Sequence, residues 1–290
     1  MRIVNETTVN HAVADARSEN VTVIEPESDW HIADWRELWR YRDLFWFLVW
    51  RGIRAKYAQS SLGIGWAIIQ PLFSMLVFTV IFGGVAQVSS DGVPYSLFSF
   101  AALVPWTYFA NAVVEGTQIL VTNANMIKKV YFPRLLLPLS AVAAKLLDFV
   151  IASVLLLVLM AWYRVAPNAG VLVIPLLVVQ MFLSAAGLGL WLTALAIQYR
   201  DVNYGINFFV QLLMYAAPVV YPASRVPSQY LWCYALNPMV GVIEGFRSAL
   251  LGTRPMPWLM IVPGFVMAVI LFVSGLLYFH RRERMFADVA

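Results

Sequence analysis

The sequence predicts an all-α, polytopic integral membrane protein, and three observations support this fold class. The 290-residue chain is 61% hydrophobic and only 12% charged, whereas ordinary soluble domains are about 25% charged. Several apolar runs reach the roughly 20 residues that a helix needs to cross a bilayer. The basic residues gather in short segments between these runs, which is the pattern that membrane topology produces.

The N-terminal part of the chain predicts a tail followed by an interfacial helix. Residues 1–30 are polar, weakly patterned and without the apolar core of a signal peptide, so we expect an uncleaved tail. Residues 31–60 place tryptophans and other apolar side chains on one helix face and arginines on the opposite face. This pattern predicts an amphipathic helix in the cytoplasmic surface of the membrane. A surface helix of a soluble core is the alternative.

The remaining chain, residues 61–290, predicts a transmembrane domain of six helices. Each apolar run is near or above the length that crosses a bilayer, and the fifth is the shortest. The six predicted spans lie near residues 65–85, 98–121, 136–162, 171–197, 205–221 and 258–279.

The charges of the connecting segments predict the orientation of the spans. Residues 86–97 contain no Lys or Arg, and residues 163–170 contain only Arg164. Residues 122–137 carry three basic side chains, as do residues 281–284 at the end of the last span. Because basic segments stay in the cytoplasm, both termini are expected on the cytoplasmic side of a bacterial inner membrane.

Residues 222–257 do not fit this scheme of complete spans. They are largely apolar, but prolines and Gly252 divide them into pieces too short to cross a bilayer. A re-entrant hairpin of two half-helices over residues 225–251, in the outer leaflet, satisfies both facts. Arg225, Arg247 and Arg254 run against the charge rule there. Glu244 and Arg247 are three residues apart, which favours a structural ion pair.

No catalytic, metal or cofactor site is predicted on this chain. The three histidines are scattered over polar flanks, so no metal site is expected. None of the four lysines follows a glycine in the manner of a phosphate-binding loop, so any ATP is expected on another subunit. Cys233 is the single cysteine, which excludes an intrachain disulfide. No basic stripe or motif indicates nucleic-acid binding.

Three ionisable residues fall inside predicted spans: Glu115, Lys145 and Asp148. Because a charge at mid-membrane costs about 2.5–3.5 kcal/mol on insertion scales, each is expected to face protein or water. Lys145 and Asp148 are three residues apart on one helix, which predicts a local ion pair. Glu115 either lines a polar path or fixes the packing of two helices.

The basic, amphiphilic segment of residues 123–134 separates the second and third spans. On the predicted topology it is a short cytoplasmic loop, within reach of a soluble partner. The chain is therefore predicted to be a membrane channel that another protein drives.

Several local patterns, in order along the chain, are similar to one protein family. They are residues 62–72 (LGIGWAIIQPL), 77–83 (VFTVIFG), 125–134 (NMIKKVYFPR), 137–140 (LPLS), 199–202 (YRDV), 218–222 (PVVYP), 237–238 (NP) and 245–247 (GFR). Together they resemble the permease subunits of polysaccharide-exporting ABC transporters, of the O-antigen, teichoic-acid and capsular types. The resemblance covers residues 36–280 and leaves the N-terminal tail unassigned.

The resemblance implies a homodimer that works with two copies of a separate ATPase subunit. That partner binds Mg-ATP, and the complex exports a polysaccharide carried on a polyprenyl-diphosphate lipid within the lipid bilayer. Residues 123–134 would be the coupling helix in the ATPase cleft, and the N-terminal helix would brace it. The residues expected to contact the ATPase are Asn125, Met126, Lys128, Lys129, Tyr131, Phe132 and Arg134, with Arg200 and Asp201 in a second, smaller contact.

The substrate that the resemblance implies directs attention to two further groups of residues. The cations of the first helix are candidates to capture the lipid diphosphate, with contact to anionic lipids as the alternative. They are Arg40, Arg42, Arg51, Arg54 and Lys56. Aromatic side chains stack on sugar rings, so those near the ends of the spans are candidates for a glycan channel and gate, with an ordinary aromatic belt as the alternative. These, with the acidic Glu115, are Trp106, Tyr108, Phe109, Glu115, Phe208, Tyr215, Tyr221, Tyr230, Trp232, Tyr234 and Phe246.

Three other functions were weighed against polymer export. An exporter of a small amphiphile or drug in the same superfamily would share the spans and the coupling segment. An ion-coupled secondary transporter would require inverted repeats and broken helices at the membrane midplane, and neither is visible. A membrane-embedded glycosyltransferase would need a carboxylate site and a large external loop, which the sequence lacks.

Overall fold

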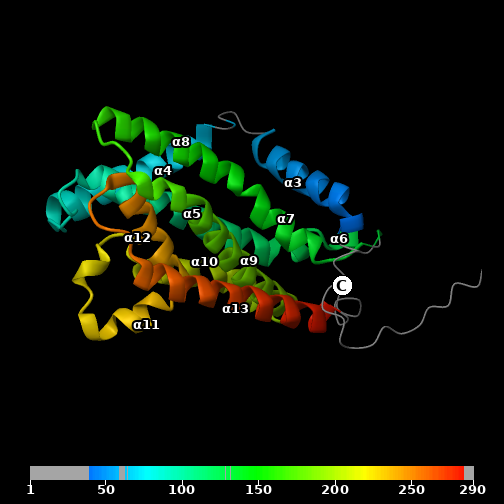
Figure 1. The fold of residues 1–290 in the computed structure, drawn as a ribbon. Coiled ribbons are helices and arrows are strands. Elements are labelled where there is room, and N and C mark those ends of the chain that lie inside the picture. Colours follow the sequence, from blue (N-terminus) through cyan, green and yellow to red (C-terminus); the bar gives the residue numbers. More distant parts are fainter. Residues whose placement is uncertain (1–38, 59–62, 64, 128, 131, 284–290) are drawn as a thin grey trace, which may run out of the picture. The chain divides into compact units, whose positions relative to one another are not determined.

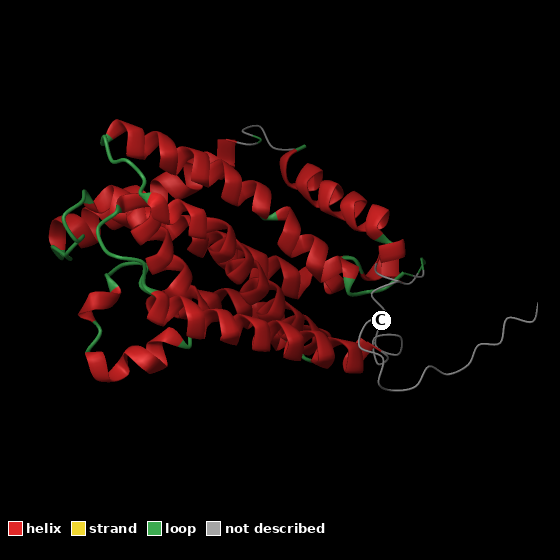
Figure 2. Ribbon diagram, in the orientation of Figure 1, coloured by secondary structure: helices red, strands yellow, loops and turns green. Residues whose placement is uncertain are grey.

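The computed structural model describes residues 39–58, 63, 65–127, 129–130 and 132–283, all within one compact unit, Trp35–Ala290. Over these residues the chain is built from helices and connecting loops, without strands, as the all-α prediction requires (Figures 1 and 2). The predicted tail of residues 1–30 lies outside the described residues, as do Lys128 and Tyr131.

Five helical segments in the described part of the chain are long and apolar enough to cross a membrane. They correspond to the predicted spans one to four and six, with ends that differ by a few residues. The segments are α4 with η1 (Gly65–Phe78 and Thr79–Val85), α5 (Tyr95–Thr122), α7 with α8 (Leu136–Ala144 and Leu146–Trp162), η2 with α9 (Ala169–Val173 and Ile174–Gln198) and α13 (Trp258–Glu283).

The predicted fifth span is shorter than expected. Its helix, α10, covers Asp201–Tyr215 and has 15 residues, about 22 Å of rise against a hydrocarbon core of about 30 Å. The chain turns after Tyr215 because the next segment contains Pro218 and Pro222 and packs in the protein interior. A total of six spans therefore stays a prediction.

Helix α12 (Pro238–Leu251) is buried along its entire length. It packs against α5, α9 and α13. Its ends follow from the local sequence: the Asn237 side chain accepts a hydrogen bond from the Met239 amide, Pro238 occupies the first turn, and Gly252 ends the helix with φ of 65°. This helix is the second half of the predicted hairpin.

The first half of the predicted hairpin is not a continuous half-helix. It consists of two 3₁₀ turns, η3 (Ala223–Arg225) and η4 (Ser228–Tyr230), and the short helix α11 (Leu231–Ala235). Prolines 222 and 227 immediately precede the two turns and prevent a longer helix. The re-entrant position of the hairpin in the membrane stays a prediction.

Helices α9 and α13 share the most extensive contact between two helices in the described part of the chain. A Cβ added to Gly187 would lie 2.5 Å from the backbone nitrogen of Phe272, and one added to Gly275 would lie 2.5 Å from the carbonyl oxygen of Gly187. Glycine at both positions lets the two backbones touch, which is how small residues join helices in membranes.

Helix α3 (Arg42–Tyr57) runs beside α7 (Figure 1). Leu48 and Val49 are buried. The tryptophans of the predicted apolar face remain exposed: Trp39 by 70%, Trp46 by 60% and Trp50 by 59%. Exposed tryptophans are typical of an interfacial helix, whose position in the membrane surface stays a prediction.

Candidate coupling surface and buried arginine network

The predicted coupling segment forms a tight connection between α5 and α7. It contains the short helix α6 (Ala124–Ile127) and then bends back toward α7. Asn125 and Lys129 are exposed, whereas Phe132 is buried and anchors the segment to the bundle. The exposed side chains are the ones that another protein can contact.

Two distant helices hold this segment in place. From α3, the Arg51 guanidinium donates to the Asn123 side-chain oxygen at 2.6 Å and contacts the Met126 sulfur at 3.0 Å. At the end of α13, Glu283 accepts from the Arg134 amide at 3.1 Å, and its carbonyl accepts from the Arg134 guanidinium at 2.9 Å. A displacement of the segment would therefore pull on both α3 and α13.

A cavity of about 530 Å³ connects the two segments that were predicted to contact an ATPase. The ends of α5, α6 and α9 and the start of α10 form its walls. Arg134 and Arg200 both line it, and Asp201 is exposed beside Arg200. The structure therefore brings residues 123–134 and the Arg200–Asp201 turn to one recess at the same end of the bundle.

The five cations predicted to capture a lipid diphosphate do not form one cluster. Arg51 and Arg54 line an open hollow of about 710 Å³, together with Phe47 and Trp50. The Arg40 and Arg42 side chains are exposed near the start of α3. Lys56 instead pairs with Asp148 of α8. Arg51 and Arg54 are therefore the members that share a surface.

The predicted ion pair between Lys145 and Asp148 is wrong. Lys145 lies at the break between α7 and α8 and pairs with Glu115 of α5, while Asp148 accepts hydrogen bonds from Lys56 and Tyr57 of α3. Packing of α5 against α7 and α8 decides the partners, because a local pair would leave Glu115 unpaired among apolar helices. Glu115 thus joins α5 to the break between α7 and α8, as expected for one of its two predicted roles, and its place in a polar path stays a prediction.

Replacing Asp148 with asparagine is expected to loosen the end of α3. The Lys56–Asp148 pair is partly exposed, so the loss of stability is small, but the pair joins α3 to a membrane helix. Limited trypsin digestion should cut after Arg54 and Lys56 several times faster. Asp43→Asn, which removes a carboxylate that is 92% exposed on the same helix, should leave the rate unchanged. Equal rates of trypsin cleavage for the two variants would show that the Lys56–Asp148 pair does not hold the end of α3 in place.

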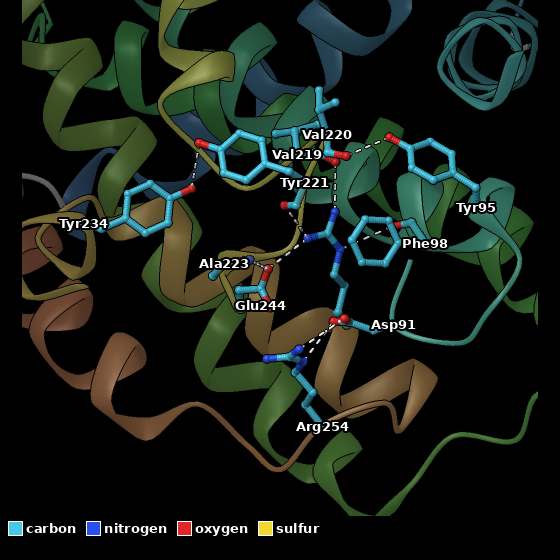
Figure 3. A network of polar contacts seen from close by, with 11 residues as sticks. Asp91, Tyr95, Phe98, Val219, Val220, Tyr221, Ala223, Tyr234, Glu244 and Arg254 are labelled. Carbon is cyan, nitrogen blue, oxygen red and sulfur yellow. Dashed lines mark hydrogen bonds and ion pairs between the residues drawn. The ribbon is translucent and has the colours of Figure 1, made fainter. Parts of the chain in front are cut away.

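At the other end of the bundle, Arg247 of α12 is the centre of a buried polar network, and Figure 3 labels its partners Phe98, Val219 and Glu244. The side chain is 2% exposed. Its guanidinium donates to the Glu244 carboxylate at 2.9 Å and lies over the Phe98 ring, 3.6 Å from the centroid. The predicted Glu244–Arg247 pair is confirmed, and the ring of Phe98 adds a cation–π contact.

The network fixes the chain segment of residues 219–223, which follows α10 (Figure 3). Arg247 donates to the carbonyls of Val219 at 2.8 Å and Tyr221 at 3.4 Å. The Tyr95 hydroxyl donates to the Val220 carbonyl at 2.7 Å, and Glu244 accepts from the amide of Ala223 at 3.1 Å. Side chains of α5 and α12 thus satisfy backbone groups that have no helical partners.

Sequence reasoning missed the contributions of Tyr95 and Phe98 to this network. Both lie in the first turn of α5, where nothing local distinguishes them from other aromatic residues at a helix end. The PVVYP pattern of residues 218–222 was the available signal, because a non-helical apolar segment must find partners for its carbonyls elsewhere.

The ten aromatic candidates for a glycan path fall into three groups by burial. Four are buried in the core: Trp106, Tyr108, Phe109 and Phe246. Four are exposed: Phe208, Tyr215, Tyr230 and Trp232. Tyr221 and Tyr234 are half-buried and hydrogen-bonded to each other at 3.3 Å. In this conformation the rings of the buried group are covered by other side chains, so the exposed group supplies the available surface.

Comparison with known proteins identifies a family for the chain. A profile of the family described as ABC-2 type transporter matches residues 43–251. The chain is 30% identical over 251 residues to the O-antigen export system permease protein RfbA of Myxococcus xanthus, covering 86% of this chain and 96% of that protein. It is 27% identical to the Klebsiella pneumoniae protein of the same name, with 82% and 92% covered.

A further relative is the polysialic acid transport protein KpsM of Escherichia coli, 25% identical over 69% of this chain and 78% of that protein. The family match covers most of the chain, from α3 to the end of α12. The described part contains several helices that are able to cross a membrane. The chain is therefore a multi-pass membrane protein that belongs to the ABC-2 type transporter family.

Proposed function

We propose that this chain is the transmembrane subunit of an ATP-driven exporter that moves a polyprenyl-diphosphate-linked polysaccharide across the bacterial inner membrane. The observation that carries the proposal is the similarity to O-antigen export permeases over 92–96% of their length. The polysialic acid transport relative supports the same class of cargo. Catalysis of ATP hydrolysis is assigned to a separate subunit.

The recess between residues 123–134 and Arg200 is the surface we assign to the ATPase. Asn125, Lys129 and Asp201 are exposed close in sequence to the lining residues Ala124, Ile127 and Arg200, and they offer polar and charged contacts of both signs. Closure of two ATPase subunits would displace α6. The contacts from Arg51 and to Glu283 would then transmit the movement to α3 and α13.

A second copy of the chain would complete the channel. Two observations support a homodimer: only Ala67 and Pro71 of α4 and η1 are fully buried, and α10 exposes Phe208 and Tyr215. A membrane helix that packs so little against its own chain is available to a neighbouring subunit. The exposed aromatic side chains of α10 would then face the glycan path.

Entry of the substrate is assigned to the outer face of α3. Arg51 and Arg54, with Trp50 beside them, combine cations with an interfacial aromatic side chain. A diphosphate carries negative charge that guanidinium groups recognise with paired hydrogen bonds. The lipid tail would remain in the bilayer while the headgroup enters the hollow.

Replacing Lys129 with glutamate tests the coupling surface. The charge reversal on an exposed side chain should reduce co-purification of the ATPase and polymer export by about tenfold, because like charges across an interface cost a few kcal/mol. Arg164→Glu, an equal change on an exposed arginine in the connection between α8 and η2, should alter neither measurement. Normal co-purification and export with Lys129→Glu would remove residues 123–134 from the ATPase contact.

The cargo is tested in cells that lack the chromosomal copy of this gene. Lipid-linked polymer should accumulate on the cytoplasmic side and disappear when the wild-type chain is restored. In proteoliposomes with the ATPase, a lipid-linked glycan should stimulate ATP hydrolysis more than a small amphiphilic drug does. Stimulation by the drug alone, without polymer accumulation in the cells, would identify an exporter of small amphiphiles instead.

A further inference from the structure

Three arginines lie between residues 225 and 254, in a segment predicted to be outside the cytoplasm, where basic side chains are not expected. The structure gives two of them an acidic partner. Arg247 is neutralised by Glu244 within α12. Arg254 donates two hydrogen bonds to the carboxylate of Asp91, at 2.9 and 3.1 Å, although the two residues are 163 positions apart in the sequence (Figure 3). The guanidinium of Arg225 has no ion pair or hydrogen bond to any residue that the structure describes.

All three arginines line one cavity of about 620 Å³. Asp91 and Glu244 are the two carboxylates in its wall, so the cavity carries a net charge of +1. Four residues add hydroxyl groups to the lining: Ser224, Ser228, Thr253 and Ser248, whose hydroxyl donates to the Arg254 carbonyl at 2.8 Å. A recess with one uncompensated guanidinium and several hydroxyl donors is complementary to an oxyanion.

The cavity lies at the start of α13, a helix that is long and apolar enough to cross a membrane. Helix α13 begins at Trp258, directly after the Pro255–Pro257 segment that lines the cavity. Trp258 is 50% exposed, and Tyr230 and Trp232, which flank the lining residue Leu231, are 57% and 70% exposed. Exposed tryptophan and tyrosine at the end of a membrane helix mark the interface between hydrocarbon and headgroups.

We propose that this cavity binds the phosphate group of a membrane lipid, with Arg225 as the principal ligand. A membrane lipid is favoured over a soluble anion because the exposed Tyr230, Trp232 and Trp258 are chain neighbours of the lining residues Leu231 and Pro257 and offer apolar surface to the glycerol and first methylenes of a lipid. Two lipids carry this chemistry at the membrane surface: a resident phospholipid and a polyprenyl phosphate carrier. The proposal concerns lipid binding and does not depend on the exported cargo.

The test measures lipid binding to the full-length chain purified in a neutral detergent, by native mass spectrometry. Phosphatidylglycerol and polyprenyl phosphate are titrated separately, with diacylglycerol as the lipid without phosphate. Arg225→Gln should bind the phosphate lipids about tenfold more weakly, the loss expected for one charge-assisted hydrogen bond. Arg225→Lys retains the charge and should stay within about threefold of wild type. Arg164→Gln, on another exposed arginine, is the matched control.

A loss with both phosphate lipids supports the proposal. A loss confined to polyprenyl phosphate assigns the cavity to the carrier lipid, and a loss confined to phosphatidylglycerol assigns it to the resident phospholipid. Equal affinity of wild type and Arg225→Gln for both lipids overturns the proposal, as does an equal loss with Arg164→Gln. Because the assay contains neither ATPase nor transport, its outcome is separate from that of the proposed exporter function.

Discussion

Replacing Arg247 with methionine is expected to lower the free energy of unfolding by about 3–5 kcal/mol, the cost of breaking a buried ion pair from one side. Methionine fills a similar volume, but the Glu244 carboxylate would remain buried without its cation. The carbonyls of Val219 and Tyr221 would also lose their donor. Denaturant unfolding of the detergent-solubilised chain measures the change.

The double variant Arg247→Met/Glu244→Gln separates the ion pair from the rest of the network. Removing both charges should recover a substantial part of the lost stability, since a neutral pair of similar volume avoids the buried charge. Arg254→Met, which breaks the more exposed pair with Asp91, should cost far less. If the Arg247 and Arg254 variants lose equal stability, burial of Arg247 does not govern the network.

Replacing Gly187 with alanine is expected to destabilise the chain by about 2–3 kcal/mol, in the range for overpacking a close contact. The added Cβ would lie 2.5 Å from the Phe272 nitrogen and 2.8 Å from the Leu271 carbonyl oxygen. Because both atoms belong to the backbone of α13, no side-chain rotation can make room. Helices α9 and α13 would have to separate along their shared contact.

Gly189→Ala is the matched control on the same helix. A Cβ at Gly189 meets no atom within 4 Å, and alanine is a better helix former than glycine by up to about 1 kcal/mol. This variant should therefore be neutral or more stable, while Gly187→Ala is less stable in the same unfolding measurement. Equal effects of the two substitutions would contradict the close approach of α9 and α13.

The long apolar helices could be predicted because hydropathy is a local property of the sequence. The spans near residues 65–85 and 258–279 agree with helices at Gly65–Val85 and Trp258–Glu283 within a few residues. The Glu244–Arg247 pair was predictable for the same reason, since both residues lie on one turn of α12. The coupling role of residues 123–134 stays a prediction from their charges and from the resemblance to a family.

The partners of the other charged side chains were decided by the tertiary structure. Lys145 has Asp148 three residues away, yet it pairs with Glu115 of α5. Asp91 and Arg254 are joined across 163 positions. Local spacing cannot predict such pairs, because helix packing determines which side chains come within hydrogen-bonding distance.

By itself the sequence determined a helical membrane protein with a basic segment between its second and third apolar helices. Only the tertiary structure gathered that segment and Arg200 at one recess and left Arg225 as the uncompensated cation of a cavity. The physical reason is that burial of apolar surface follows from composition along the chain. Recognition sites instead depend on where separate helices place a few polar groups relative to one another.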